Sequence, residues 1–192
     1  AVWTAGAGQT GFTALGEILN GSVNPSGKTV DTFISDLTQS PSYNNSGNFV
    51  YDNMEEHAYT STSWLTGQEE TVIPTFVNYD EGIYVGYKFY ETAYAEAQKA
   101  ATAESAGAAG LSFDYDKTVV YPFGYGLSYT TFKQKMGKLT ESDGAISFDV
   151  TVTNTGKVAG KDVVEVYYNP PYTNGGIEKA AANLIAFDKT ES

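Results

Sequence analysis

The pattern of apolar and polar residues changes along the chain. Apolar residues recur at intervals of three and four from Phe12 to Leu19, which predicts a helix from about Gln9 to Leu19. From residue 132 onward, apolar and polar residues alternate, most regularly from Ile146 to Thr153, a pattern typical of a half-buried strand. The chain is therefore expected to hold an α/β part followed by an all-β part.

Other stretches add to this outline. A helix is expected from Glu91 to Ala109, where Ala, Glu, Gln and Lys dominate, with Gly107 and Gly110 at its end. Apolar, aromatic or β-branched runs predict strands at 1–5, 79–90, 162–168 and 184–187.

The stretch from Ile34 to Ile73 is the least regular and predicts a long loop. It carries Tyr59 and Trp64, whose rings can either stack on a sugar or anchor the loop on the protein surface. It also holds His57, beside two glutamates. A single histidine in a chain without cysteine has no ligand spacing typical of a metal site, so no metal is expected.

The glycines from Gly6 to Gly11 match the G-x-G-x-x-G pattern of dinucleotide-binding folds, and Asp31 follows Gly11 at the distance of a ribose-binding acid. After Asn20, however, the chain enters irregular polar sequence instead of a second βαβ unit. We therefore expect a turn between a strand and a helix, and no nucleotide or other cofactor.

The aromatic stretch from Pro122 to Phe132 predicts a tight, buried corner. Pro122 fixes its own φ, and Gly124 and Gly126 can adopt backbone angles that are costly for other residues. The surrounding tyrosines and phenylalanines supply a large apolar area that suits the packing of one layer on another.

Four stretches together are similar to glycoside hydrolase family 3, the β-glucosidases and their relatives, and they occur in the order found in that family. They are 24–28 (NPSGK), 79–90 (YDEGIYVGYKFY), 121–132 (YPFGYGLSYTTF) and 152–167, with VTNTG and GKDVVEVY at its two ends.

The resemblance implies that residues 1–131 are the C-terminal part of an α/β sandwich domain with long loops and a helical insertion. Residues 132–192 would be the N-terminal part of a fibronectin-III-like domain. It also implies that the nucleophilic aspartate lies on a separate barrel domain and that the acid/base glutamate precedes residue 1. No catalytic residue is therefore expected in this chain, and Glu81 is carried over as structural.

The resemblance thus predicts part of a retaining β-glycosidase, inactive by itself, whose missing barrel domain completes the site. The parent enzyme would hydrolyse small β-glycosides or oligosaccharides, and glucosides, xylosides and N-acetylglucosaminides remain alternatives. Tyr59 and Trp64 are the candidate sugar contacts. The alternative from another class is a carbohydrate-binding or scaffold module without catalysis.

Charge and composition limit the kinds of binding partner and cellular compartment that are expected. The net charge is −12, with 11 basic and 23 acidic residues, which argues against nucleic acid and against an anionic membrane surface. The chain has no cysteine, and this absence fits a cytoplasmic protein while leaving a secreted one as the alternative.

Overall fold

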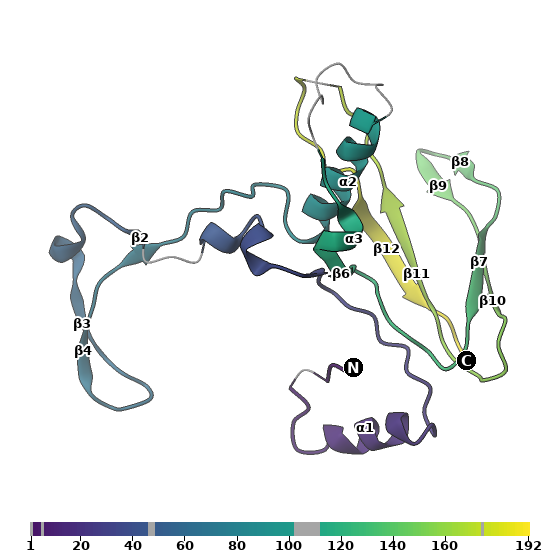
Figure 1. The fold of residues 1–192 in the computed structure, drawn as a ribbon, viewed down its shortest axis with the longest axis horizontal. Helices are drawn as coiled ribbons and strands as arrows, with labels where there is room; N and C mark the ends of the chain where they lie inside the picture. The colour runs from purple at the N-terminus through teal and green to yellow at the C-terminus, as the bar shows by residue number, and fades with distance from the viewer. Residues whose placement is uncertain (1, 5, 46–48, 102–111, 174) are drawn as a thin grey trace. The chain divides into compact units, whose positions relative to one another are not determined.

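The computed structural model describes residues 2–4, 6–45, 49–101, 112–173 and 175–192 (Figure 1). The chain forms two compact units. The first unit comprises Ala1–Phe33, Tyr121–Pro170 and Ala181–Ser192, and the second comprises Ile34–Val120 and Pro171–Ala180. Small antiparallel sheets with few helices make up both units.

The first unit begins with helix α1 (Gly11–Leu19), which confirms the helix expected there. Thr10 precedes the helix and Asn20 ends it. None of its residues is buried, so its apolar side chains do not form a core among the described residues. The strand expected at 1–5 is wrong over residues 2–4, which have no regular structure, and residues 1 and 5 lie outside the described part.

Among the described residues of the first unit, six strands form three antiparallel pairs. These pairs are β7 (Phe132–Met136) with β10 (Val150–Asn154), β8 (Thr140–Ser142) with β9 (Ala145–Ser147), and β11 (Val163–Tyr168) with β12 (Asn183–Lys189). The strands expected at 162–168 and 184–187 are confirmed. The single strand expected over 146–153 is wrong, because β9 and β10 pair with different partners and the chain leaves the ladder between them.

In the described part of the second unit, four strands form a hairpin and a shorter pair, and two α-helices follow them along the chain. The elements are β2 (Phe49–Val50), β3 (Tyr59–Thr62), β4 (Glu69–Val72), β5 (Thr75–Phe76), α2 (Tyr87–Ala101) and α3 (Tyr115–Thr118). Before β3, the described residues also form three short 3₁₀ helices, η1 (Leu37–Gln39), η2 (Tyr43–Asn45) and η3 (Met54–His57). Two short strands, β1 (Phe33–Ile34) and β6 (Val119–Tyr121), span the points where the units divide.

The strand expected at 79–90 is wrong. Residues 80–83 form a turn, Gly82 and Gly86 have φ of 54° and 58°, and α2 begins at Tyr87. The aromatic residues of this stretch follow helical spacing, which places Tyr90 in the core with 3% exposure. The helix expected from Glu91 therefore starts earlier, and its predicted end at Gly107 and Gly110 lies outside the described residues.

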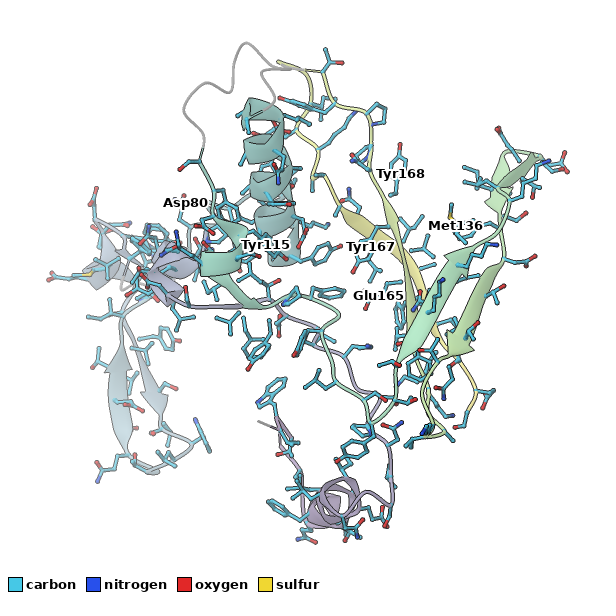
Figure 2. All side chains as sticks on the ribbon, turned by 45° about the vertical axis from the view of Figure 1, so that its right-hand side comes forward. Asp80, Tyr115, Met136, Glu165, Tyr167 and Tyr168 are labelled. Carbon is cyan, nitrogen blue, oxygen red and sulfur yellow. The ribbon has the colours of Figure 1, made fainter. Side chains whose placement is uncertain are left out.

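Helices α2 and α3 are joined by an aromatic contact. The ring of Tyr115, which is labelled in Figure 2, meets that of Tyr94 edge to face at 5.2 Å. The Tyr115 hydroxyl donates to the Glu91 carboxylate. Within the described residues, none of the helices is long and apolar enough to cross a bilayer.

Candidate functional site

The two candidate sugar contacts lie on the β3–β4 hairpin of the second unit (Figure 1). Its strands pair from Tyr59 opposite Val72 to Thr62 opposite Glu69. The turn closes where the Ser63 N–H donates to the Gln68 carbonyl at 2.8 Å. The irregular loop expected here is therefore wrong, and the β-branched residues of both strands were the available signal.

Trp64 stands at the tip of this hairpin with 94% of its surface exposed. Tyr59 is 56% exposed at the start of β3, and the strand rise of about 3.3 Å per residue puts it roughly 10 Å from the end of that strand. One sugar ring cannot span that length. The hairpin thus holds both aromatic side chains but does not bring them to a single subsite.

The acidic residues near the next turn are held by a buried asparagine. Asn45 is 5% exposed, its amide donates to the Glu81 carboxylate, and its oxygen accepts from the Asp80 N–H at 3.4 Å. Asp80 itself, labelled in Figure 2, also accepts from Asn78 at 2.6 Å. Glu81 thus fixes the turn to η2, an arrangement that suits a structural role.

His57 ends the helix η3 and contacts Asn53 at 3.1 Å. Over the ranges that the structure describes, His, Cys, Asp and Glu form no group of three or more that could hold a metal ion.

Sequence reasoning missed a cluster in the first unit that is organised by the side chain of Asn24. Its Oδ1 accepts from the Ser128 hydroxyl and from the Tyr129 N–H, both at 2.8 Å. Its Nδ2 donates to the Ala159 carbonyl at 2.9 Å. One amide therefore connects three separate stretches of the chain, and we call this arrangement the Asn24 clasp.

Next to the clasp, residues 27–29 run against the 122–126 corner. The Thr29 N–H donates to the Tyr125 carbonyl, and the Gly124 N–H donates to the Thr29 carbonyl, each at 2.8 Å. A Cβ on Gly126 would lie 2.2 Å from the Gly27 carbonyl oxygen. Only glycine allows the backbones to approach this closely.

Strand β11 also approaches the corner through Glu165 (Figure 2). Its carboxylate would lie 2.5 Å from a Cβ on Gly124, whose φ is 76°. The Tyr167 hydroxyl donates to the same carboxylate at 2.8 Å. Gly124 thus meets two requirements, the positive φ and the space for Glu165.

A charged pair lies between the 24–28 stretch and the start of β11. Lys28 Nζ is 3.5 Å from Asp162 Oδ1, and the Asp162 side chain is 12% exposed. The Gln134 amide of β7 donates to the other oxygen of Asp162 at 2.8 Å. The Asp162 N–H donates to the Thr190 hydroxyl at 3.0 Å. Asp162 therefore connects the β7–β10 and β11–β12 strand pairs to the 24–28 stretch.

The corner is less buried than its composition predicts. Tyr121 is 40% exposed, Tyr129 49% and Leu127 71%. Hydrogen bonds to the backbone, rather than complete burial of rings, hold this corner. The expectation of a buried corner is therefore wrong for these three side chains.

No protein-family model matches the chain. Beta-glucosidase A of Butyrivibrio fibrisolvens is 35% identical over 199 residues, with 95% of this chain and 18% of that protein covered. Beta-glucosidase of Ruminococcus albus is 33% identical, with 99% and 15% covered.

The GH3 beta-glucosidase of Bifidobacterium adolescentis matches the fold with a TM-score of 0.63 and 28% identity, over 95% of this chain and 20% of that one. The chain belongs to glycoside hydrolase family 3. The family resemblance seen in the four motifs is confirmed. The chain spans less than a fifth of the length of these two curated relatives.

Three of the four family 3 motifs meet in the first unit. Asn24 and Lys28 come from the first motif, Ser128 and Tyr129 from the aromatic motif, and Asp162 from the last. The remaining motif supplies Glu81 and the start of α2 in the second unit.

Proposed function

We propose that this chain is part of a retaining β-glucosidase and that it is not catalytic by itself. The enzyme hydrolyses O-glycosidic bonds of small β-glycosides, and its barrel domain supplies the nucleophile. The similarity to β-glucosidases over at least 95% of the chain carries this proposal. The contacts of the motif residues support the proposal, because these residues bond to other parts of the chain and so serve to hold its structure.

Retaining glycosidases need two carboxyl groups about 5 Å apart, one as nucleophile and one as acid/base. The motif acids of this chain serve other contacts: Glu81 is bound by Asn45, and Asp162 by Lys28 and Gln134. A carboxylate held in such contacts is poorly placed to attack a sugar or to exchange a proton with it.

We further propose that residues 1–131 complete an α/β sandwich domain and that residues 132–192 begin a fibronectin-III-like domain. The antiparallel pairs from β7 to β12 support the second part. The bond from Gln134 on β7 to the stretch before β11 also suits two sheets of one sandwich.

Hydrolysis of p-nitrophenyl β-D-glucoside by the purified chain tests the proposal. We expect no release of p-nitrophenol above the rate in buffer. Glu81→Gln and Glu55→Gln variants serve as controls for trace activity. Turnover by the chain that disappears in either variant would place a catalytic carboxylate inside it and overturn the proposal.

We also propose that Trp64 is a sugar contact of the enzyme. A fully accessible indole offers a flat apolar face to a pyranose ring, and Gln68 and Glu69 flank the turn with groups that bond hydroxyls. Tyr59 would then contact a different ring of the same oligosaccharide.

Nuclear magnetic resonance of the two indole N–H groups tests this contact, with cellotetraose as the probe. We expect the Trp64 signal to shift and the signal of Trp3, which packs edge to face on Phe33, to stay. Trp3→Phe assigns the two signals and serves as the matched control. An unmoved Trp64 signal at saturating sugar would contradict the contact.

The alternative is a carbohydrate-binding module without any catalytic parent, and the exposed tip of the hairpin favours it. The two functions differ in one measurable respect. A module binds cellotetraose fully by itself, whereas a segment of an enzyme binds it more weakly than the complete protein does.

A further inference from the structure

Helix α1 ends at Leu19 and is followed by the sequence Asn20-Gly21-Ser22, whose three residues are exposed. Gly21 has φ of 82°, and its N–H donates to the Ile18 carbonyl at 3.1 Å. The Ser22 N–H donates to Asn20 Oδ1 at 2.8 Å. The side-chain amide of Asn20 is thus folded back over the backbone that follows it.

We propose that Asn20 is a site of spontaneous deamidation. The backbone nitrogen of Gly21 attacks Asn20 Cγ and loses its proton, the bond from Cγ to Nδ2 breaks, and ammonia leaves. The product is a five-membered succinimide. Water then adds to one of its two carbonyls, and ring opening gives aspartate or isoaspartate. The reaction needs no reagent other than water.

Two features of the site favour the attack. Gly21 has no side chain, so its nitrogen is accessible and its backbone can rotate into the ring geometry. The Ser22 N–H already points at Oδ1, where negative charge develops when nitrogen adds to the carbonyl, and a donor in that position stabilises such a charge.

One contact opposes the attack, namely the bond from the Gly21 N–H to Ile18. This bond belongs to the last turn of a helix with no buried residue, and such turns open readily. The opposing contact therefore slows the reaction without preventing it.

The product changes the neighbourhood of the Asn24 clasp. Aspartate places a negative charge at the C-terminal end of α1, where the helix dipole disfavours it. Isoaspartate adds a methylene to the backbone between α1 and Asn24. The Tyr129 hydroxyl donates to the Ile18 carbonyl and so holds the end of α1. We expect both products to weaken this attachment.

Peptide mass spectrometry of the chain after incubation at mildly alkaline pH tests the proposal. The chain contains internal references: Asn24 precedes Pro25, which has no N–H for the attack, and Asn174 precedes Gly175 in a second Asn-Gly pair. We expect succinimide, aspartate and isoaspartate at position 20, and unchanged amide at position 24.

The Ser22→Pro variant removes the donor to Oδ1, and we expect slower conversion at Asn20 while circular dichroism stays unchanged. Conversion at the same rate in that variant would refute the activating role of Ser22. An intact Asn20 in a sample where Asn174 has been converted would overturn the proposal altogether, because it would show that the end of the helix protects its asparagine.

Discussion

The backbone N–H of Tyr129 donates to Asn24 Oδ1 at 2.8 Å, although 105 positions separate the two residues in the sequence. The Ser128 hydroxyl shares the same acceptor, and the amide nitrogen of Asn24 reaches Ala159. Contacts between three of the family 3 motifs therefore explain why some of their residues are needed. Our central claim is that these motifs hold the first unit together and that they do not take part in the hydrolysis of glycosides.

Replacement of Gly126 by alanine tests the close approach of the 27–29 stretch to the corner. The new Cβ would lie 2.2 Å from a backbone oxygen, which cannot move without the whole stretch, so we expect a loss of about 1 to 3 kcal/mol in the free energy of unfolding. Urea unfolding measures it.

Gly16→Ala is the matched control, because open space surrounds Gly16 inside α1. This variant should gain up to about 1 kcal/mol from helix propensity. Equal effects of the two substitutions would show that Gly126 is not under steric constraint.

Asp162→Asn tests the charged pair beside the clasp. The substitution removes the charge that faces Lys28 in a mostly buried place, and we expect a loss of about 2 kcal/mol or more. Glu191→Gln is the control, since the pair of Glu191 with Lys161 is exposed and should contribute less than about 1 kcal/mol. Thermal melting of both variants at the same salt concentration measures these losses. A larger decrease in melting temperature for Glu191→Gln than for Asp162→Asn would contradict the prediction.

The raised pKa of Tyr115 predicts that the folded chain loses stability at alkaline pH. Burial, followed by the hydrogen bond to Glu91, raises the pKa of Tyr115 well above its usual value of 10.0. The folded chain therefore keeps a proton that the unfolded chain releases. This contribution is complete below about pH 10 and is lost as the pH rises toward the folded-state pKa.

Urea unfolding between about pH 9 and pH 11 measures this effect. Tyr115→Phe should unfold with a shallower dependence on pH than the original chain. Part of the dependence should remain, because burial also raises the pKa values of Tyr84 and Tyr90. An unchanged slope in the variant would mean that Tyr115 ionises normally.

Local patterns predicted several elements correctly. Helical spacing placed α1, and the β-branched runs placed β11 and β12. The pattern failed at 79–90, where aromatic residues suggested a strand, because the positive φ of Gly82 and Gly86 permits a turn and then a helix. Strand β7 was missed because its polar residues mask the alternation.

The Asn24 clasp could not be predicted from spacing, because hydrogen bonds between residues 104 to 135 positions apart leave no periodic signal. The motifs indicated which stretches matter and suggested a corner at 122–132. They did not indicate that a single amide joins three of these stretches. For the candidate site, the sequence supplied Tyr59 and Trp64, but only the register of β3 and β4 revealed that they are too far apart for one ring.

The most direct measurement for the central claim is the free energy of unfolding of Asn24→Ala, with Asn53→Ala as the control. Among the described contacts, the Asn53 side chain bonds only to His57, in a local, exposed pair. Because Asn24→Ala removes three hydrogen bonds between distant stretches, we predict a loss of about 2 to 3 kcal/mol, against a few tenths for the control. Equal stability of the two variants would contradict the account, because it would show that the family 3 motifs are not held together by this amide.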